Sequence, residues 1–180
     1  MRGGIGALVS WALLDTLVTR RLLADEVAPL VDRWARDLVT QCADLRRRTI
    51  SPIDWQAHVE RLLATVDLDD LLRYIDFERL TRALELPELG ATTARVEFPR
   101  LDGAPEPPQL YRKIFGLKRG RAIIPHGHRN MVSAHLVLRG EFHLRHYDRV
   151  EDQGHHLVIR PTIDRSAGPG EASSIFRASR

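Results

Sequence analysis

The sequence predicts an α+β protein in which a helical N-terminal half precedes a β-rich C-terminal half. Through residues 8–86, apolar residues recur at three- and four-residue steps, which is the period of amphipathic helices. After residue 90 the pattern changes to short alternating runs separated by glycine and proline, which is typical of a β sandwich or barrel. The 180 residues are 43% hydrophobic, enough to bury a core. We therefore expect a helical domain over residues 1–90 and a β domain over residues 91–180.

The N-terminus opens with an apolar stretch that resembles the start of a secretory signal. Asp15 interrupts this stretch, Arg20 and Arg21 follow it, and no small-residue cleavage site precedes the next helix. The stretch is also shorter than the roughly 20 apolar residues that a bilayer crossing needs. The single cysteine, Cys42, excludes a disulfide framework and suits a reducing compartment. We expect an amphipathic first helix, a cytoplasmic location and no membrane association.

Helix boundaries are marked by capping residues. Ser51 is followed by Pro52 and Asp54, the pattern of a helix N-terminus with serine as the N-cap. Asp67 and Asp76 are expected to cap two further short helices. These helices carry apolar stripes and no catalytic constellation.

The second half reads as a series of short strands. Arg139-Gly140 predicts a tight turn that joins two of these strands as a hairpin. The expected strands cover residues 93–98, 110–115, 121–124, 132–138, 141–147 and 155–160.

The net charge of +3 divides unevenly along the chain. Residues 1–90 hold 12 basic and 15 acidic residues, whereas residues 91–180 hold 15 basic and 9 acidic ones. A basic half invites a nucleic-acid interpretation. However, its arginines are scattered and form no binding stripe, so we expect no nucleic-acid partner.

Histidines are concentrated in the second half, where seven of the eight lie between His126 and His156. His126 and His128 alternate on an extended segment, so their side chains emerge on one face about 6–7 Å apart along the backbone. Two imidazoles so placed can converge on one metal ion. The pair alone also fits two surface histidines in a Pro-Gly loop.

The surrounding spacing resembles the first signature of the cupin superfamily, a small jelly-roll barrel. That signature runs glycine, five residues, His-x-His, three or four residues, glutamate, six residues, glycine. Gly120, His126, His128 and Gly140 fall on every spacing, while Ser133 occupies the acidic position. The resemblance covers residues 92–180 and implies a helical N-terminal region followed by a cupin-type jelly roll.

The missing carboxylate leaves the third ligand open. His135 faces the same side of the strand as Ser133 and could complete a metal site with His126 and His128. Three such nitrogens suit Fe(II), the favoured ion, and also Zn, Ni, Mn or Cu. The other interpretation of His135 is a barrel-interior histidine that binds nothing.

The second cupin signature is degenerate. Counting from Gly170, its histidine position holds Ser173 and its asparagine position holds Arg177. A jelly roll needs roughly eight strands, and the sequence offers about six. We therefore expect an incomplete barrel, truncated or frameshifted after Ile175.

Two function classes follow from the resemblance. The first is a metal-dependent, dioxygenase-like oxidoreductase acting on a small organic substrate, with Arg145 and Tyr147 binding that substrate if their strand face points inward. An exposed Arg145 paired with Asp148 or Glu151 is the alternative for that residue. The second class is a non-catalytic cupin that serves as a small-ligand sensor or as a structural or interaction protein. The resemblance also leaves a homodimer open.

Overall fold

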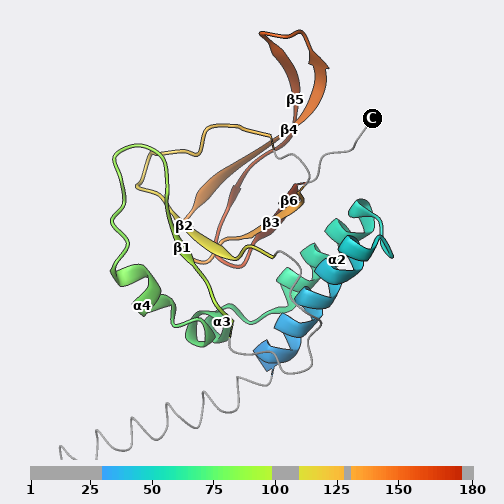
Figure 1. Cartoon of the computed structure of the whole chain (residues 1–180). Helices are drawn as coiled ribbons and strands as arrows, with labels where there is room; N and C mark the ends of the chain where they lie inside the picture. Colours follow the sequence, from blue (N-terminus) through green and yellow to red (C-terminus); the bar gives the residue numbers. More distant parts are fainter. Residues whose placement is uncertain (1–29, 99–109, 128–130, 176–180) are drawn as a thin grey trace, which may run out of the picture.

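A computed structural model describes residues 30–98, 110–127 and 131–175 (Figure 1). Helices occupy the N-terminal part of this range and antiparallel strands the C-terminal part, which confirms the α+β class. A helical segment over residues 30–47 is followed by α2 (Pro52–Thr65), α3 (Leu68–Tyr74), α4 (Phe77–Arg82), β1 (Thr92–Arg95), β2 (Lys113–Gly116), β3 (Ser133–Leu136), β4 (Phe142–Asp152), β5 (Leu157–Ala167) and β6 (Ala172–Ile175).

Two of the three expected N-caps are confirmed. The Ser51 hydroxyl accepts a hydrogen bond from the Asp54 N–H at 3.1 Å, and the Asp67 carboxylate accepts one from the Asp70 N–H at 2.9 Å. The prediction for Asp76 is wrong. It precedes α4 with a left-handed φ of 50° and makes no side-chain cap, because its carboxylate pairs with Arg79 at 2.7 Å.

The strands form three antiparallel pairs, β1–β2, β3–β6 and β4–β5. Gly140 does turn the chain after β3, with a φ of 82°. The expected hairpin between β3 and β4 is nevertheless wrong, because β3 pairs with β6 and β4 pairs with β5. The segment 121–124, expected as a strand, is exposed and has no regular structure, whereas β6 was not anticipated as a strand.

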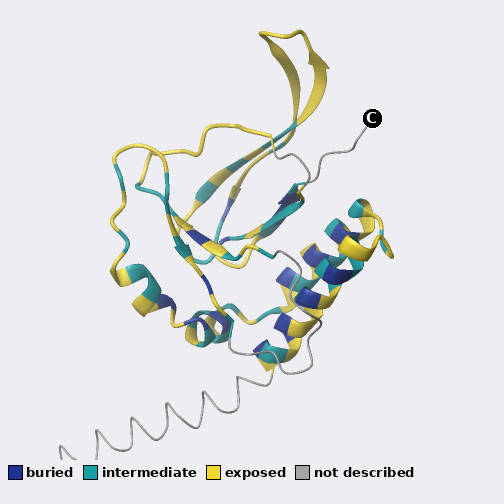
Figure 2. Ribbon diagram, in the orientation of Figure 1, coloured by how far each residue is buried: buried dark blue, intermediate teal, exposed yellow. Residues whose placement is uncertain are grey.

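Helices and strands share one hydrophobic core. The buried cluster joins residues of the helical part, such as Trp34 and Val59, to Val96 and Ile114 beside and within the β1–β2 pair. The Trp34 indole N–H donates to the Leu62 carbonyl at 2.9 Å and ties the 30–47 helix to α2. Figure 2 shows buried residues along the inner sides of the helices and an exposed outer part of the β4–β5 hairpin. The boundary near residue 90 thus separates helices from strands along the chain but does not divide this core.

Within the described ranges, no helix combines the length and the apolar character that crossing a membrane requires.

Candidate functional site

The β3–β6 pair has two distinct faces. Ala134, Leu136 and Ala172 pack on the core beside α2. Side chains alternate along a strand, so Ser133 and His135 lie on the opposite face. β3 therefore turns His135, the expected third ligand, away from the helices.

A polar contact with α2 sets the position of this pair. The Gln56 side-chain N–H donates to the Ser174 hydroxyl at 2.9 Å, and that hydroxyl donates to the Glu60 carboxylate at 2.6 Å. Ser174 is opposite Ala134 in the register. The contact therefore fixes which face of β3 is directed at the helix and which carries His135.

His135 is exposed and directly opposes Ser173 of β6. Directly opposed residues in an antiparallel pair have Cβ atoms about 4.5–5.5 Å apart. Ser173 is only 3% exposed, and its hydroxyl has no hydrogen-bond partner among the described residues. A buried hydroxyl and an exposed imidazole are therefore opposite each other at this position of the β3–β6 pair.

His126 lies in the exposed segment that leads towards β3. Its Nδ1 is 2.9 Å from the Ile124 carbonyl oxygen. A carbonyl can only accept, so Nδ1 carries the proton and the lone pair of the neutral ring is on Nε2.

The predicted three-histidine set extends past the described part of the chain. His128 lies outside the described residues. Within those residues, no group of three or more His, Cys, Asp or Glu side chains is close enough to hold a metal ion. The set of His126, His128 and His135 thus stays a prediction.

Arg145 is on the exposed face of the β4–β5 hairpin. Its guanidinium pairs with Asp164 across the strands at 3.7 Å, and the His143 ring contacts the same carboxylate. The hydrogen bond from His143, more than the charge of Arg145, lowers the pKa of Asp164. The expected partner Asp148 instead pairs with Arg160 at 3.1 Å.

Tyr147 is separated from Arg145 by a register shift between His146 and Tyr147. Such a shift re-aims the side chains that follow it. Tyr147 is half-buried, as is His146. Burial lowers the pKa of His146, with Glu60 opposing the shift and Arg165 adding to it. The substrate-binding roles of Arg145 and Tyr147 remain predictions.

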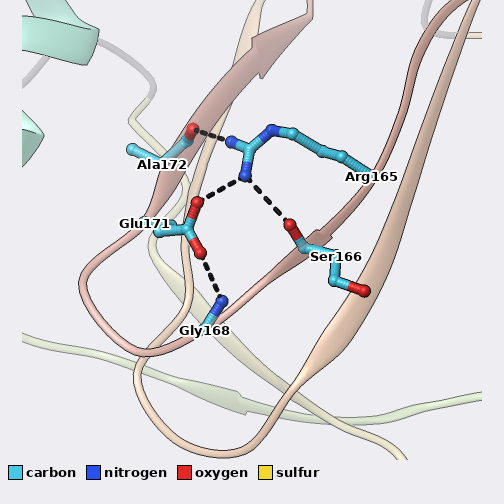
Figure 3. A network of polar contacts seen from close by, with 5 residues as sticks. All are labelled: Arg165, Ser166, Gly168, Glu171 and Ala172. Atoms are coloured by element: carbon cyan, nitrogen blue, oxygen red, sulfur yellow. Dashed lines mark hydrogen bonds and ion pairs between the residues drawn. The ribbon is translucent and has the colours of Figure 1, made fainter.

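A polar network that the sequence did not reveal holds the turn between β5 and β6 (Figure 3). Arg165 donates to the Glu171 carboxylate at 2.5 Å and to the Ala172 carbonyl at 3.3 Å, while the Gly168 N–H donates to Glu171 at 2.6 Å. Chiefly the Gly168 N–H, and then Arg165, lower the pKa of Glu171. Gly170 has a φ of 86°, which favours glycine. The only signal in the sequence was the Gly-Pro-Gly turn, because the Arg165–Glu171 pairing depends on that turn's geometry.

Two open hollows in the described part of the chain lie on its helical side. One, of about 510 Å³, is bounded by residues 45 and 48–52. The other, of about 270 Å³, lies between the 30–47 helix and the stretch from Leu62 to Asp70. Neither is lined by a residue of the strands.

Comparisons with protein-family models, with curated proteins and with solved structures give no match for this chain.

Proposed function

We propose that this chain is a cupin-like protein that binds one divalent metal ion through His126, His128 and His135. The observation that carries the proposal is the tautomer of His126. Metal-bound histidines characteristically donate their other ring N–H to a carbonyl or carboxylate, which fixes the ring and directs its lone pair. His126 makes this contact with Ile124, so Nε2 is the atom that would ligate the ion.

The placement of His135 supports the same site. It is exposed on the face of β3 that turns away from α2, where a metal ion can reach the ring. The neighbouring Ser173 hydroxyl is a buried polar group without a hydrogen-bond partner among the described residues, beside the ring that would hold the ion. Imidazole donors suit Fe(II), Zn, Ni, Mn and Cu, and we favour Fe(II).

A metal ion in such a site would act as a Lewis acid and would orient a small organic substrate. If the ion is iron, the site would also support dioxygenase-like oxidation of that substrate. In this proposal the chain itself holds and orients the ion, with Ile124 locking one ligand. Arg145 would offer a positive charge to an acidic substrate. That substrate has to compete with Asp164, which already pairs with the guanidinium.

A non-catalytic role is the second candidate, and the cavities favour it. Enzyme pockets usually enclose most of a small ligand. Of two hollows in the described residues, one is lined mainly by the turn before α2 and the other by the 30–47 helix and residues 62–70, and neither includes His126 or His135. A metal-holding sensor or interaction protein needs no such pocket beside the ion.

Zinc titration of the metal-stripped full chain by calorimetry tests the site. One ion per chain is expected for the wild type, and His126→Ala and His135→Ala are each expected to weaken binding by about tenfold to a hundredfold or more, because each removes a ligand. His155→Ala, an exposed histidine in the β4–β5 turn, is the matched control and should bind as the wild type does. Wild-type protein that takes up no zinc, or variants that all bind equally well, would refute the site.

A further inference from the structure

The outer part of the β4–β5 hairpin extends from the body of the protein (Figure 1). Strand β5 of this hairpin carries three consecutive apolar residues that are exposed, Leu157 at 52%, Val158 at 40% and Ile159 at 42%. Consecutive exposed apolar residues on a strand are uncommon in a stable monomer, because such a strand can pair with another chain.

The hydrogen-bonding pattern shows which backbone groups of β5 are directed outward. The Gln153 N–H donates to the His156 carbonyl at 2.9 Å, so residue 156 faces β4. Backbone groups alternate in direction along a strand, and the one register shift opposite residues 157–161 places its extra residue, Val150, on β4, so the alternation of β5 itself is unbroken there. Val158 therefore faces β4, while the N–H and C=O groups of Leu157 and Ile159 lie on the outer edge. Pro161 holds the next outward position and ends the row of donors, because proline has no N–H.

The opposite edge of the hairpin, on β4, is protected against pairing. It carries charged residues at most positions from Asp148 to Asp152 and a register shift around Val150. Charges and bulges at an edge discourage strand addition. Two ion pairs lie within the hairpin beside the apolar residues of β5, Arg160–Asp148 and Arg149–Asp152, while Glu151 is opposite Val158 on the β4 side.

We propose that the β5 edge, residues Leu157–Ile159, is a dimer interface that pairs antiparallel with the same edge of a second copy. A two-fold axis through Val158 places Leu157 opposite the partner subunit's Ile159, and Ile159 opposite the partner subunit's Leu157. Both pairs are formed by outward-directed residues, so each exchanges two backbone hydrogen bonds. The two hairpins then form one four-stranded ribbon.

A second copy is the occupant that this edge fits best. The stretch of β5 that can pair is bounded on both sides of Val158, by Pro161 in one direction and by the Gly154 turn in the other. An antiparallel second copy therefore pairs with the same stretch of residues. In this pairing the apolar side chains of one copy contact the apolar side chains of the other. The interface is isologous, as in most two-fold dimers. Because it is short, we expect a weak and reversible dimer.

Charge reversal at the axis tests the proposal, since the two Val158 side chains face each other there. In sedimentation equilibrium of the full chain, Val158→Lys and Val158→Asp should each raise the dimer dissociation constant by roughly tenfold or more, because like charges are directly opposed. An equimolar mixture of the two variants should recover association. Val150→Lys, at an apolar position of β4 with 45% exposure, is the matched control and should dimerise as the wild type does.

Amide hydrogen exchange gives a second measurement that needs no variant. Protection of the Leu157 and Ile159 amides should increase with protein concentration, whereas that of Val158 should not, because its N–H is directed at β4. A wild-type chain that is monomeric at every concentration, or variants whose mixture associates no better than either alone, would overturn the proposal.

Discussion

At the scale of single residues, burial and hydrogen bonding separate the histidines that composition had grouped together. His126 has its tautomer set by Ile124, His135 is exposed on β3, and His143 contacts Asp164 on the outer face of the hairpin. His146 is on the other, half-buried side of the same strand, as the alternation of the sequence indicates. The sequence could predict these faces from the two-residue period, but not the Ile124 contact, which depends on the local backbone path.

His146 should make the stability of the protein depend on pH. Burial holds its pKa below the ordinary 6.5, so the unfolded chain binds a proton more readily than the folded one. Stability therefore falls as the pH drops from 6.5 towards the lower pKa of the folded state. Urea unfolding at pH 7.0 and 5.5 should show a smaller loss for His146→Gln than for the wild type.

His155→Gln is the control for this experiment, since the residue is exposed in the hairpin turn. It should keep the wild-type pH dependence. The pKa values of the Asp164 and Glu171 carboxylates are lowered from 3.8 and 4.5, so their protonation affects the stability only at a pH below the range of this experiment. An identical loss for His146→Gln and the wild type would show that His146 is not the group responsible.

At the scale of elements, two local capping signals predict what the structure shows, whereas the pairing of distant strands lies beyond local patterns. The Ser51 and Asp67 caps are local, so a few residues suffice to predict them. The pairing of β3 with β6 is not local, because it depends on Ser174 reaching Gln56 and Glu60 more than 110 residues earlier in the chain. A turn signal at Arg139-Gly140 carries no information about that contact, which is why the expected β3–β4 hairpin was wrong.

The Ser51 cap should have a measurable effect on stability. Ser51→Ala removes the acceptor for the Asp54 N–H and should lower the free energy of unfolding by about 1 kcal/mol. Ser51→Thr keeps a hydroxyl that accepts from the Asp54 N–H and donates to the Asp54 carboxylate, and it should stay close to the wild type. Chemical denaturation of both variants measures the difference, and equal losses for the two would mean that the hydrogen bond contributes nothing.

At the scale of the whole molecule, the sequence predicted the order of helices and strands and the α+β class. It did not predict that Val96 and Ile114 complete a core with Trp34 and Val59, because periodicity shows that a face is buried but not what covers it. The jelly roll and the metal site stay proposals. The described strands form three separate pairs, and His128 lies outside the described residues.

X-ray absorption spectroscopy of the zinc-loaded full chain tests the metal site most directly, because it counts the ligating atoms around the ion. With His126, His128 and His135 as ligands, the spectrum should show about three imidazole nitrogens at roughly 2.0–2.1 Å. A shell of oxygen atoms without imidazole scattering would contradict the proposed site.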